Sequence, residues 1–97
     1  MGISIRFFTV LREITGKREE ILEFPQFKTV AVDAILKKLA EHYGKKFREY
    51  VYDGKTGEVK GFLQFLVNGR SIMSFEGFNT KLVDGDVLAI VPPVGGG

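Results

Sequence analysis

Residues 82–97 read LVDGDVLAIVPPVGGG and form the most informative stretch of the 97-residue sequence. The Asp-Gly-Asp at residues 84–86 predicts a tight turn, and the aliphatic run at residues 87–91 predicts a strand. Pro92 and Pro93 end this strand, because proline has no backbone N–H to donate to a sheet. The stretch therefore predicts a last strand that releases the chain as an extended tail.

The tail ends in consecutive glycines, and glycine makes up 12 of the 97 residues. At that frequency, such a run at a named place has a chance of roughly a few in a thousand. The two prolines give the tail a stiff exit, and glycines without a Cβ can enter a narrow channel. A frayed end or a cloning remnant is the alternative explanation. We favour a folded domain over residues 1–91 and a reactive tail over residues 92–97, which carries the α-carboxylate of Gly97 into the site of another enzyme.

The N-terminal part predicts a hairpin. Residues 3–11 read ISIRFFTVL, and the alternation of apolar residues in their first half predicts a strand. Gly16 and Lys17 supply a turn, and residues 19–24 predict a second strand that Pro25 ends.

The next segment has helical periodicity. Thr29 is the expected N-cap of this helix, and Gly44 is its expected stop. Residues 45–52 predict a further short helical turn, and residues 53–57 (DGKTG) predict a polar turn. The apolar residues of the main helix follow spacings of three and four and lie on one stripe: Val32, Ile35, Leu36, Leu39 and Tyr43.

The C-terminal half returns to strands. Residues 62–67 predict a third strand, the Asn-Gly at residues 68–69 accepts the positive φ values of a tight hairpin turn, and residues 70–73 form its partner. Residues 75–82 predict a loop with a helical turn. The resulting order packs economically as a mixed sheet of four or five strands on one main helix, which is an α+β fold.

The composition excludes several classes of function. The net charge is +2, from 14 basic and 12 acidic residues, whereas nucleic-acid binding usually needs a dense basic patch. The chain has no cysteine, which excludes disulfides and thiolate metal sites. No apolar run approaches the roughly 20 residues of a membrane span, and the N-terminus has no signal-peptide pattern. We therefore expect a cytoplasmic protein that binds neither nucleic acid nor membrane.

Conventional catalytic and metal-binding sets are missing. One histidine, His42, makes no metal site without neighbouring ligands. Residues 54–56 (GKT) resemble the end of a P-loop, but Glu49 stands where that motif requires glycine, so a turn is the better interpretation. Asp84 and Asp86 lack the ligand ladder of a calcium loop and are interpreted as turn formers. We expect no metal site and no permanently bound cofactor.

A basic stretch with interleaved aromatic residues runs through the helical region. Such a mixture can bind RNA. Because the aromatic residues are spaced to pack inward and Glu41 and Glu49 interrupt the charge, we interpret the stretch as a solvated helix face, with docking of an acidic protein as an alternative. The residues concerned are Lys37, Lys38, Lys45, Lys46 and Arg48, with Tyr43, Phe47 and Tyr50 between them.

Three stretches resemble the MoaD/ThiS family of sulfur carriers, which are ubiquitin-like β-grasp proteins. Residues 7–13 (FFTVLRE), with Gly16 just after, resemble the first strand and turn of the family, and residues 67–69 (VNG) resemble its central hairpin. Residues 82–97 resemble the family's ending almost position for position. The resemblance covers essentially the whole fold, and it implies a β-grasp domain with a flexible Gly-Gly tail.

Within this family, the Pro-Pro-Val-x-Gly-Gly ending is typical of the small subunit of molybdopterin synthase. The resemblance implies that an E1-like adenylyltransferase uses ATP to adenylate Gly97 and that a sulfur donor enzyme converts it to a thiocarboxylate. The tail then enters the large subunit of molybdopterin synthase, where its sulfur passes to the pyranopterin precursor of the molybdenum or tungsten cofactor. The reactive tail is then Gly95, Gly96 and Gly97, and the residues expected to contact the partner are Phe8, Arg12, Val91, Pro92, Pro93 and Val94.

Residues 44–61 form a longer connection than in short bacterial small subunits and resemble the form common in archaea. Some relatives of that form are conjugated to lysines as ubiquitin-like modifiers or supply sulfur for tRNA thiolation. All these fates begin with the same adenylate, so the tail sequence leaves them open. An interaction module with an inert tail is a further alternative.

Overall fold

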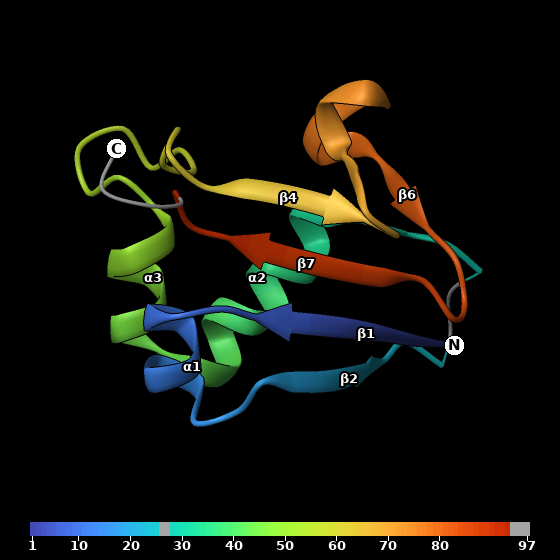
Figure 1. Ribbon diagram of the computed structural model, residues 1–97, viewed down its shortest axis with the longest axis horizontal. Helices are drawn as coiled ribbons and strands as arrows, with labels where there is room; N and C mark the ends of the chain where they lie inside the picture. The colour runs from blue at the N-terminus through green and yellow to red at the C-terminus, as the bar shows by residue number, and fades with distance from the viewer. Residues whose placement is uncertain (26–27, 94–97) are drawn as a thin grey trace.

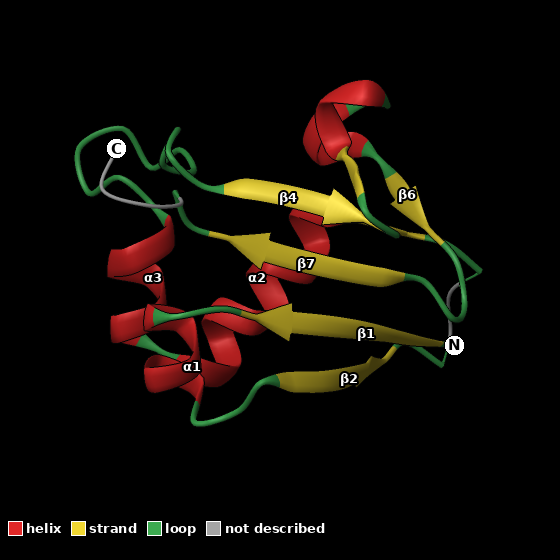
Figure 2. Cartoon of the chain, viewed as in Figure 1, coloured by secondary structure: helices red, strands yellow, loops and turns green. Residues whose placement is uncertain are grey.

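The structure is a computed structural model that describes residues 1–25 and 28–93. Five strands form one mixed sheet in the order β2-β1-β7-β4-β5, and the short strands β3 and β6 form a second sheet. Figures 1 and 2 show α2 crossing behind the strands of the large sheet, with α1 and α3 gathered at one end. The elements in chain order are β1 (Gly2–Phe7), α1 (Val10–Thr15), β2 (Glu19–Glu23), β3 (Val30–Ala31), α2 (Val32–Tyr43), α3 (Lys45–Val51), β4 (Gln64–Val67), β5 (Arg70–Ser71), the 3₁₀ turns η1 (Ile72–Ser74) and η2 (Gly77–Asn79), β6 (Lys81–Leu82) and β7 (Val87–Val91).

The last strand is the centre of the large sheet. β7 runs parallel to β1, with Phe7 opposite Ile90, and antiparallel to β4, with Gln64 opposite Val91. Because side chains alternate between the two faces of a strand, every second residue turns toward the helices. The buried members of this face in the large sheet are Ile3, Ile5, Phe7, Leu22, Phe65, Val67, Leu88 and Ile90. The strand predicted over residues 87–91 is confirmed, as is a mixed sheet packed on one main helix.

Helix α2 supplies the other half of the core. The predicted apolar stripe is confirmed, since Val32, Ile35, Leu36 and Leu39 are fully buried. The short helix predicted after it is also confirmed as α3, which adds Phe47 and Val51 to the core. Gly44 separates the two helices with a φ of 79°, a backbone conformation that glycine adopts at little cost.

The Asp-Gly-Asp turn ties three strands together at the end of the sheet where β7 begins. Oδ2 of Asp86 accepts the N–H of Val83 at 2.8 Å, and its Oδ1 accepts the side-chain amide of Asn68 at 3.0 Å. Oδ1 of Asp84 accepts the N–H of Gly2 at 2.7 Å. Both aspartates are therefore turn formers, as predicted.

The strand predicted over residues 3–11 is too long. β1 ends at Phe7, and the chain continues into α1, which buries Leu11 completely in the core. The two strands are therefore joined by this helix, with Gly16 as its left-handed cap, and not by a two-residue turn. Burial of Leu11 overrides the strand propensity of the segment, because propensity is a weak term beside core packing.

Two predictions around the second, smaller sheet are also wrong. Thr29 is not the N-cap of α2, because β3 occupies the residues before the helix and pairs with β6, a strand within the segment predicted as a loop. The first N–H of the helix, that of Val32, donates instead to the carbonyl oxygen of Thr80 at 3.0 Å. The strand predicted over residues 70–73 stops at Ser71, and η1 begins at the next residue, Ile72.

Candidate functional site

The tail leaves the fold between two neighbouring strand ends. Val91, the last residue of β7, lies opposite Gln64 at the start of β4. On its other side, the parallel register of β1 and β7 continues to Phe8, which follows the last residue of β1. Pro92 is half-buried and Pro93 is exposed. The remaining predicted tail residues, Val94, Gly95, Gly96 and Gly97, lie outside the described residues.

Phe8 and Arg12 form one unit at this exit. Nε of Arg12 donates a hydrogen bond to the carbonyl oxygen of Phe7 at 3.0 Å, and its guanidinium carbon lies 5.3 Å from the centre of the Phe8 ring. Phe8 is half-buried and Arg12 is exposed, and a cation over an aromatic ring at the surface contributes about 0.5–1 kcal/mol. The structure thus brings Phe8 and Arg12 to the end of the molecule where Val91 releases the tail. Their contact with a partner stays a prediction.

The turn that joins Phe8 to Arg12 was not predicted from the sequence. Thr9 has φ 46° and ψ −114°, the values of the first central residue of a type II′ turn, where glycine is preferred. The N–H of Leu11 closes this turn by donating to the carbonyl oxygen of Phe8 at 3.1 Å. The reversal carries Arg12 back onto Phe8. No sequence signal marks such a turn, because threonine is β-branched and rarely takes a positive φ.

The sheet face away from the helices begins at the same exit. Arg6, Ala89 and Leu66 lie side by side across β1, β7 and β4, and Val91 follows Ala89 on the same face. Ala89, Leu66 and Val91 are only partly buried, whereas Arg6 is exposed and pairs with Glu19 through Nε and Oε2 at 3.0 Å. The result is an apolar strip with charged residues at its rim, which is the arrangement of protein-binding surfaces.

The P-loop-like segment is a turn closed by its own carboxylate. Oδ1 of Asp53 accepts the backbone N–H of Lys55 at 2.7 Å and that of Thr56 at 3.2 Å. These two hydrogen bonds lower the pKa of Asp53, because they favour its charged form. The N–H groups that would face a phosphate are therefore already occupied, and the interpretation of this segment as a turn is confirmed.

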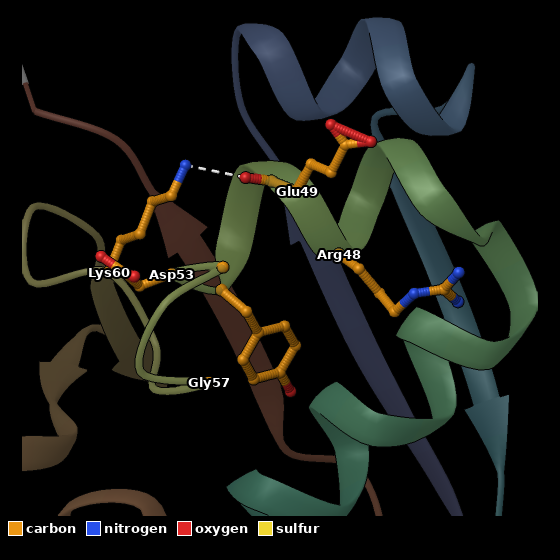
Figure 3. Close-up of a pocket in the computed structure, with 7 residues that line it drawn as sticks. Arg48, Glu49, Asp53, Gly57 and Lys60 are labelled. Atoms are coloured by element: carbon orange, nitrogen blue, oxygen red, sulfur yellow. Dashed lines mark hydrogen bonds between the residues drawn. The ribbon is translucent and has the colours of Figure 1, made fainter.

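The basic stretch stays largely at the surface, where some of its members bind neighbouring groups of the fold. Lys60 lies outside this stretch, and its Nζ donates to the carbonyl oxygen of Glu49 at 2.7 Å beside a surface hollow, as Figure 3 shows. Nη1 of Arg48 donates to the carbonyl oxygen of Ala40 at 3.3 Å. Both carbonyl groups lie in the last turn of a helix, where cations are stabilised by the helix dipole. Lys37 pairs with Asp33 at 3.2 Å, and Lys45 pairs with Glu49 at 3.8 Å.

Other candidate chemistry is sparse in the part of the chain that the structure describes. No group of three His, Cys, Asp or Glu side chains there could hold a metal ion. The His42 ring packs edge-on against Tyr43, with ring centres 4.7 Å apart. Among the same residues, no helix combines the length and the hydropathy needed to cross a membrane.

A mixed sheet that wraps one main helix, with the last strand at its centre, defines a ubiquitin-like β-grasp protein. The family is shown by a model of the ThiS family that matches residues 5–97. The chain therefore belongs to the ThiS family of ubiquitin-like sulfur carriers.

Known relatives match over the whole length. The chain is 33% identical to small archaeal modifier protein 3 of Haloferax volcanii over 97 residues, which covers all of both proteins. The crystal structure of SAMP1 from Haloferax volcanii matches with a TM-score of 0.83 at 24% identity, again over all of both chains. A Pyrococcus furiosus structure named as subunit 1 of a molybdopterin converting factor matches with a TM-score of 0.73 at 26% identity, over 97% of this chain and 99% of that one.

Proposed function

We propose that this protein is a carrier whose Gly97 is adenylated by an E1-like adenylyltransferase with ATP and then thiocarboxylated by a sulfur donor enzyme. The observation that carries the proposal is the position of the tail exit. The central strand ends at Val91, between Phe8, which follows β1, and Gln64, which begins β4, and beside the partly apolar face of the sheet that points away from the described helices. A partner that docks on this surface receives the tail in the same event. We place this chemistry in the cytoplasm.

The chemistry explains why the carrier needs no catalytic side chain of its own. A carboxylate is a poor acyl donor at neutral pH, because oxide would be the leaving group. Attack of a Gly97 carboxylate oxygen on the α-phosphorus of ATP forms an acyl-adenylate and releases pyrophosphate. Hydrosulfide delivered by the sulfur donor enzyme then attacks the acyl carbon and displaces AMP, and it loses its proton, so that sulfur replaces one carboxylate oxygen. The carrier supplies the acyl group, and the partner's site supplies the activating groups.

For the acceptor of this sulfur, we propose the pyranopterin precursor of the molybdenum or tungsten cofactor, bound in the large subunit of molybdopterin synthase. The double proline before the glycines supports this choice. So does the likeness to the Pyrococcus furiosus structure named as a subunit of a molybdopterin converting factor. In this role the protein acts as the sulfur-donating subunit of the synthase.

A second candidate is a protein modifier, in which a lysine amine attacks the activated Gly97 carbonyl and forms an isopeptide bond. It is favoured by the 33% identity with small archaeal modifier protein 3 over the full length of both proteins. Thiolation of tRNA is a third destination for the same sulfur. The three fates share the adenylate and differ only in the group that receives the activated tail.

The test is reconstitution with the E1-like enzyme of the source organism, ATP and a sulfur donor, followed by intact-mass analysis. Thiocarboxylation replaces oxygen by sulfur and adds about 16 Da. The matched control lacks both Gly96 and Gly97, because removal of Gly97 alone leaves another Gly-Gly end. An active enzyme that leaves the mass of the full chain unchanged would refute the proposal.

Two further assays separate the acceptors. Conversion of the pyranopterin precursor by the thiocarboxylated carrier with the synthase large subunit supports the first candidate. Lys81 is the last basic residue of the chain, so trypsin leaves residues 82–97 attached to any modified lysine. Proteomic detection of this remnant supports the modifier, and its absence from cells rich in the protein counts against it.

A further inference from the structure

Two residues other than glycine have a positive φ in the described part of the chain. They are Thr9, with φ 46°, and Asn68, with φ 50°. Asparagine tolerates this conformation, whereas for a β-branched residue such as threonine it is a genuine outlier. Strained residues of this kind persist only where something compensates for the strain.

For Asn68 the compensation lies within the fold. Its side-chain amide donates to Oδ1 of Asp86 at 3.0 Å, and its Oδ1 accepts the N–H of Val87 at 3.0 Å. It also stands before Gly69, with φ 85°, in the two-residue hairpin turn that asparagine and glycine favour. The side chain of Asn68 thus stabilises the start of β7 through its hydrogen bonds to Asp86 and Val87.

For the side chain of Thr9 no comparable role within the fold is found among the described residues. The side chain is exposed, and its hydroxyl makes no hydrogen bond to any of them. Thr9 stands at the N-cap position of α1, yet its side chain does not cap the helix. Glycine would adopt the same type II′ turn without strain. The fold alone therefore gives no reason for threonine at this position.

The location of Thr9 supplies a reason outside the fold. It lies between Phe8 and Arg12, the pair joined at the tail exit by the 5.3 Å contact of cation and ring. Its turn is closed by the Leu11 N–H, which fixes the direction of the Cα–Cβ bond, and β-branching restricts the χ1 angle of the side chain. A side chain held rigidly at a surface costs little entropy when a partner covers it.

We propose that the Thr9 side chain is a contact residue for the E1-like enzyme that activates the tail. The inference rests on the proposed function and deepens it by adding a residue to the docking surface. The activating enzyme is the partner of choice, because every fate of the tail begins with its adenylate. Thr9 itself takes no part in the chemical step.

The test compares Thr9→Gly and Thr9→Ala with Thr29→Gly. Thr29 is a matched control, because it is also an exposed threonine but lies away from the tail exit. It precedes β3, which pairs with β6, and β6 leads into the start of β7, whereas the tail leaves from the end of β7. Each variant is assayed for carrier-dependent exchange of pyrophosphate into ATP by the E1-like enzyme, and its thermal unfolding is recorded.

We expect Thr9→Gly to unfold at the same temperature as the natural chain or higher, because glycine relieves the strain. The KM for the carrier rises by about fivefold or more in both Thr9 variants, while kcat at saturating carrier stays unchanged and Thr29→Gly behaves as the natural chain. Thr9→Ala matters because it removes most of the side chain but retains a Cβ in the strained turn.

Three results would overturn the inference. One is a KM within about twofold of the natural value for Thr9→Gly. Another is a higher KM for Thr9→Gly together with an unchanged KM for Thr9→Ala, which would show that a more flexible backbone, and not the lost side chain, weakens binding. The third is a lower unfolding temperature of Thr9→Gly, which would show that the side chain serves the fold. If the natural chain supports exchange that does not depend on Gly96 and Gly97, the proposed function fails as well, and the two failures are thereby distinguished.

Discussion

The guanidinium of Arg12 lies over the ring of Phe8, 5.3 Å from its centre, at the end of the sheet where the tail leaves the fold. The Thr9 turn and the hydrogen bond from Arg12 to the Phe7 carbonyl hold this pair in the free protein. A preformed pair reduces the entropy that a partner must spend on ordering these side chains. The proposed docking surface is therefore already formed in the free protein.

Replacing Arg12 tests this surface. We expect Arg12→Ala to raise the KM of the activating enzyme for the carrier by about tenfold, as for a typical arginine anchor. The free energy of unfolding falls by only about 1 kcal/mol or less, because Arg12 is exposed and its contact to the half-buried Phe8 ring lies at the surface. Arg70→Ala, at the hairpin of β4 and β5, is the control. Equal effects of the two substitutions on KM would contradict the prediction.

Lys60→Met removes the cation that caps α3 but keeps an unbranched apolar stem. The bond from Nζ to the Glu49 carbonyl is 2.7 Å long, so we expect a loss of about 0.5–1 kcal/mol in the free energy of unfolding. Urea unfolding of the variant measures it, with Lys55→Met at the exposed loop as the control. A midpoint of Lys60→Met equal to that of the control would show that the cap does not stabilise the helix.

The ionisation of Asp53 in the loop after α3 makes the stability of the fold depend on pH. Its pKa is lowered in the fold by the N–H groups of Lys55 and Thr56, so its contribution to stability is present above the ordinary aspartate pKa. That contribution is lost as the pH falls from about 4 through the lower pKa of the folded state. We expect the stability difference between the natural chain and Asp53→Ala to shrink over this range. NMR titration that gives Asp53 an ordinary or raised pKa would contradict this.

Tyr52→Phe is expected to leave the protein as stable as before or more stable by up to about 1 kcal/mol. The phenol oxygen of Tyr52 is shielded from solvent and has no hydrogen-bond partner among the described residues. Burial, with the charge of Asp33 as a smaller cause, raises the pKa of Tyr52. Tyr43→Phe is the matched control and should be destabilising, because its hydroxyl donates to Glu20. If urea unfolding shows that Tyr52→Phe is less stable than Tyr43→Phe, the prediction is wrong.

The parts of the fold that follow from the sequence are those fixed by local periodicity. The stripe of α2 and the apolar run of β7 are visible in the chain because each buries one continuous set of neighbours. β3 and β6 are not visible, since two-residue strands are too short to show alternation. α1 is hidden for a different reason: its residues have strand propensity, and only the burial of Leu11 decides their conformation.

The residues of the candidate site also differ in how far the sequence predicts them. The tail and its prolines stand out in the sequence, whereas Phe8, Arg12 and Val91 were indicated by family resemblance. The structure places them at one end of the sheet through the register of β1 and β7. Thr9 had no signal in the sequence, because its proposed role depends on a backbone conformation that threonine seldom takes.

The most direct test of the central claim is the intact mass of this protein purified from its own cells without reducing or alkaline steps. The account predicts a species about 16 Da heavier than the unmodified chain, which disappears when Gly96 and Gly97 are deleted. A chain found only at its unmodified mass and attached to no other protein, in cells whose E1-like enzyme is active, would contradict the account.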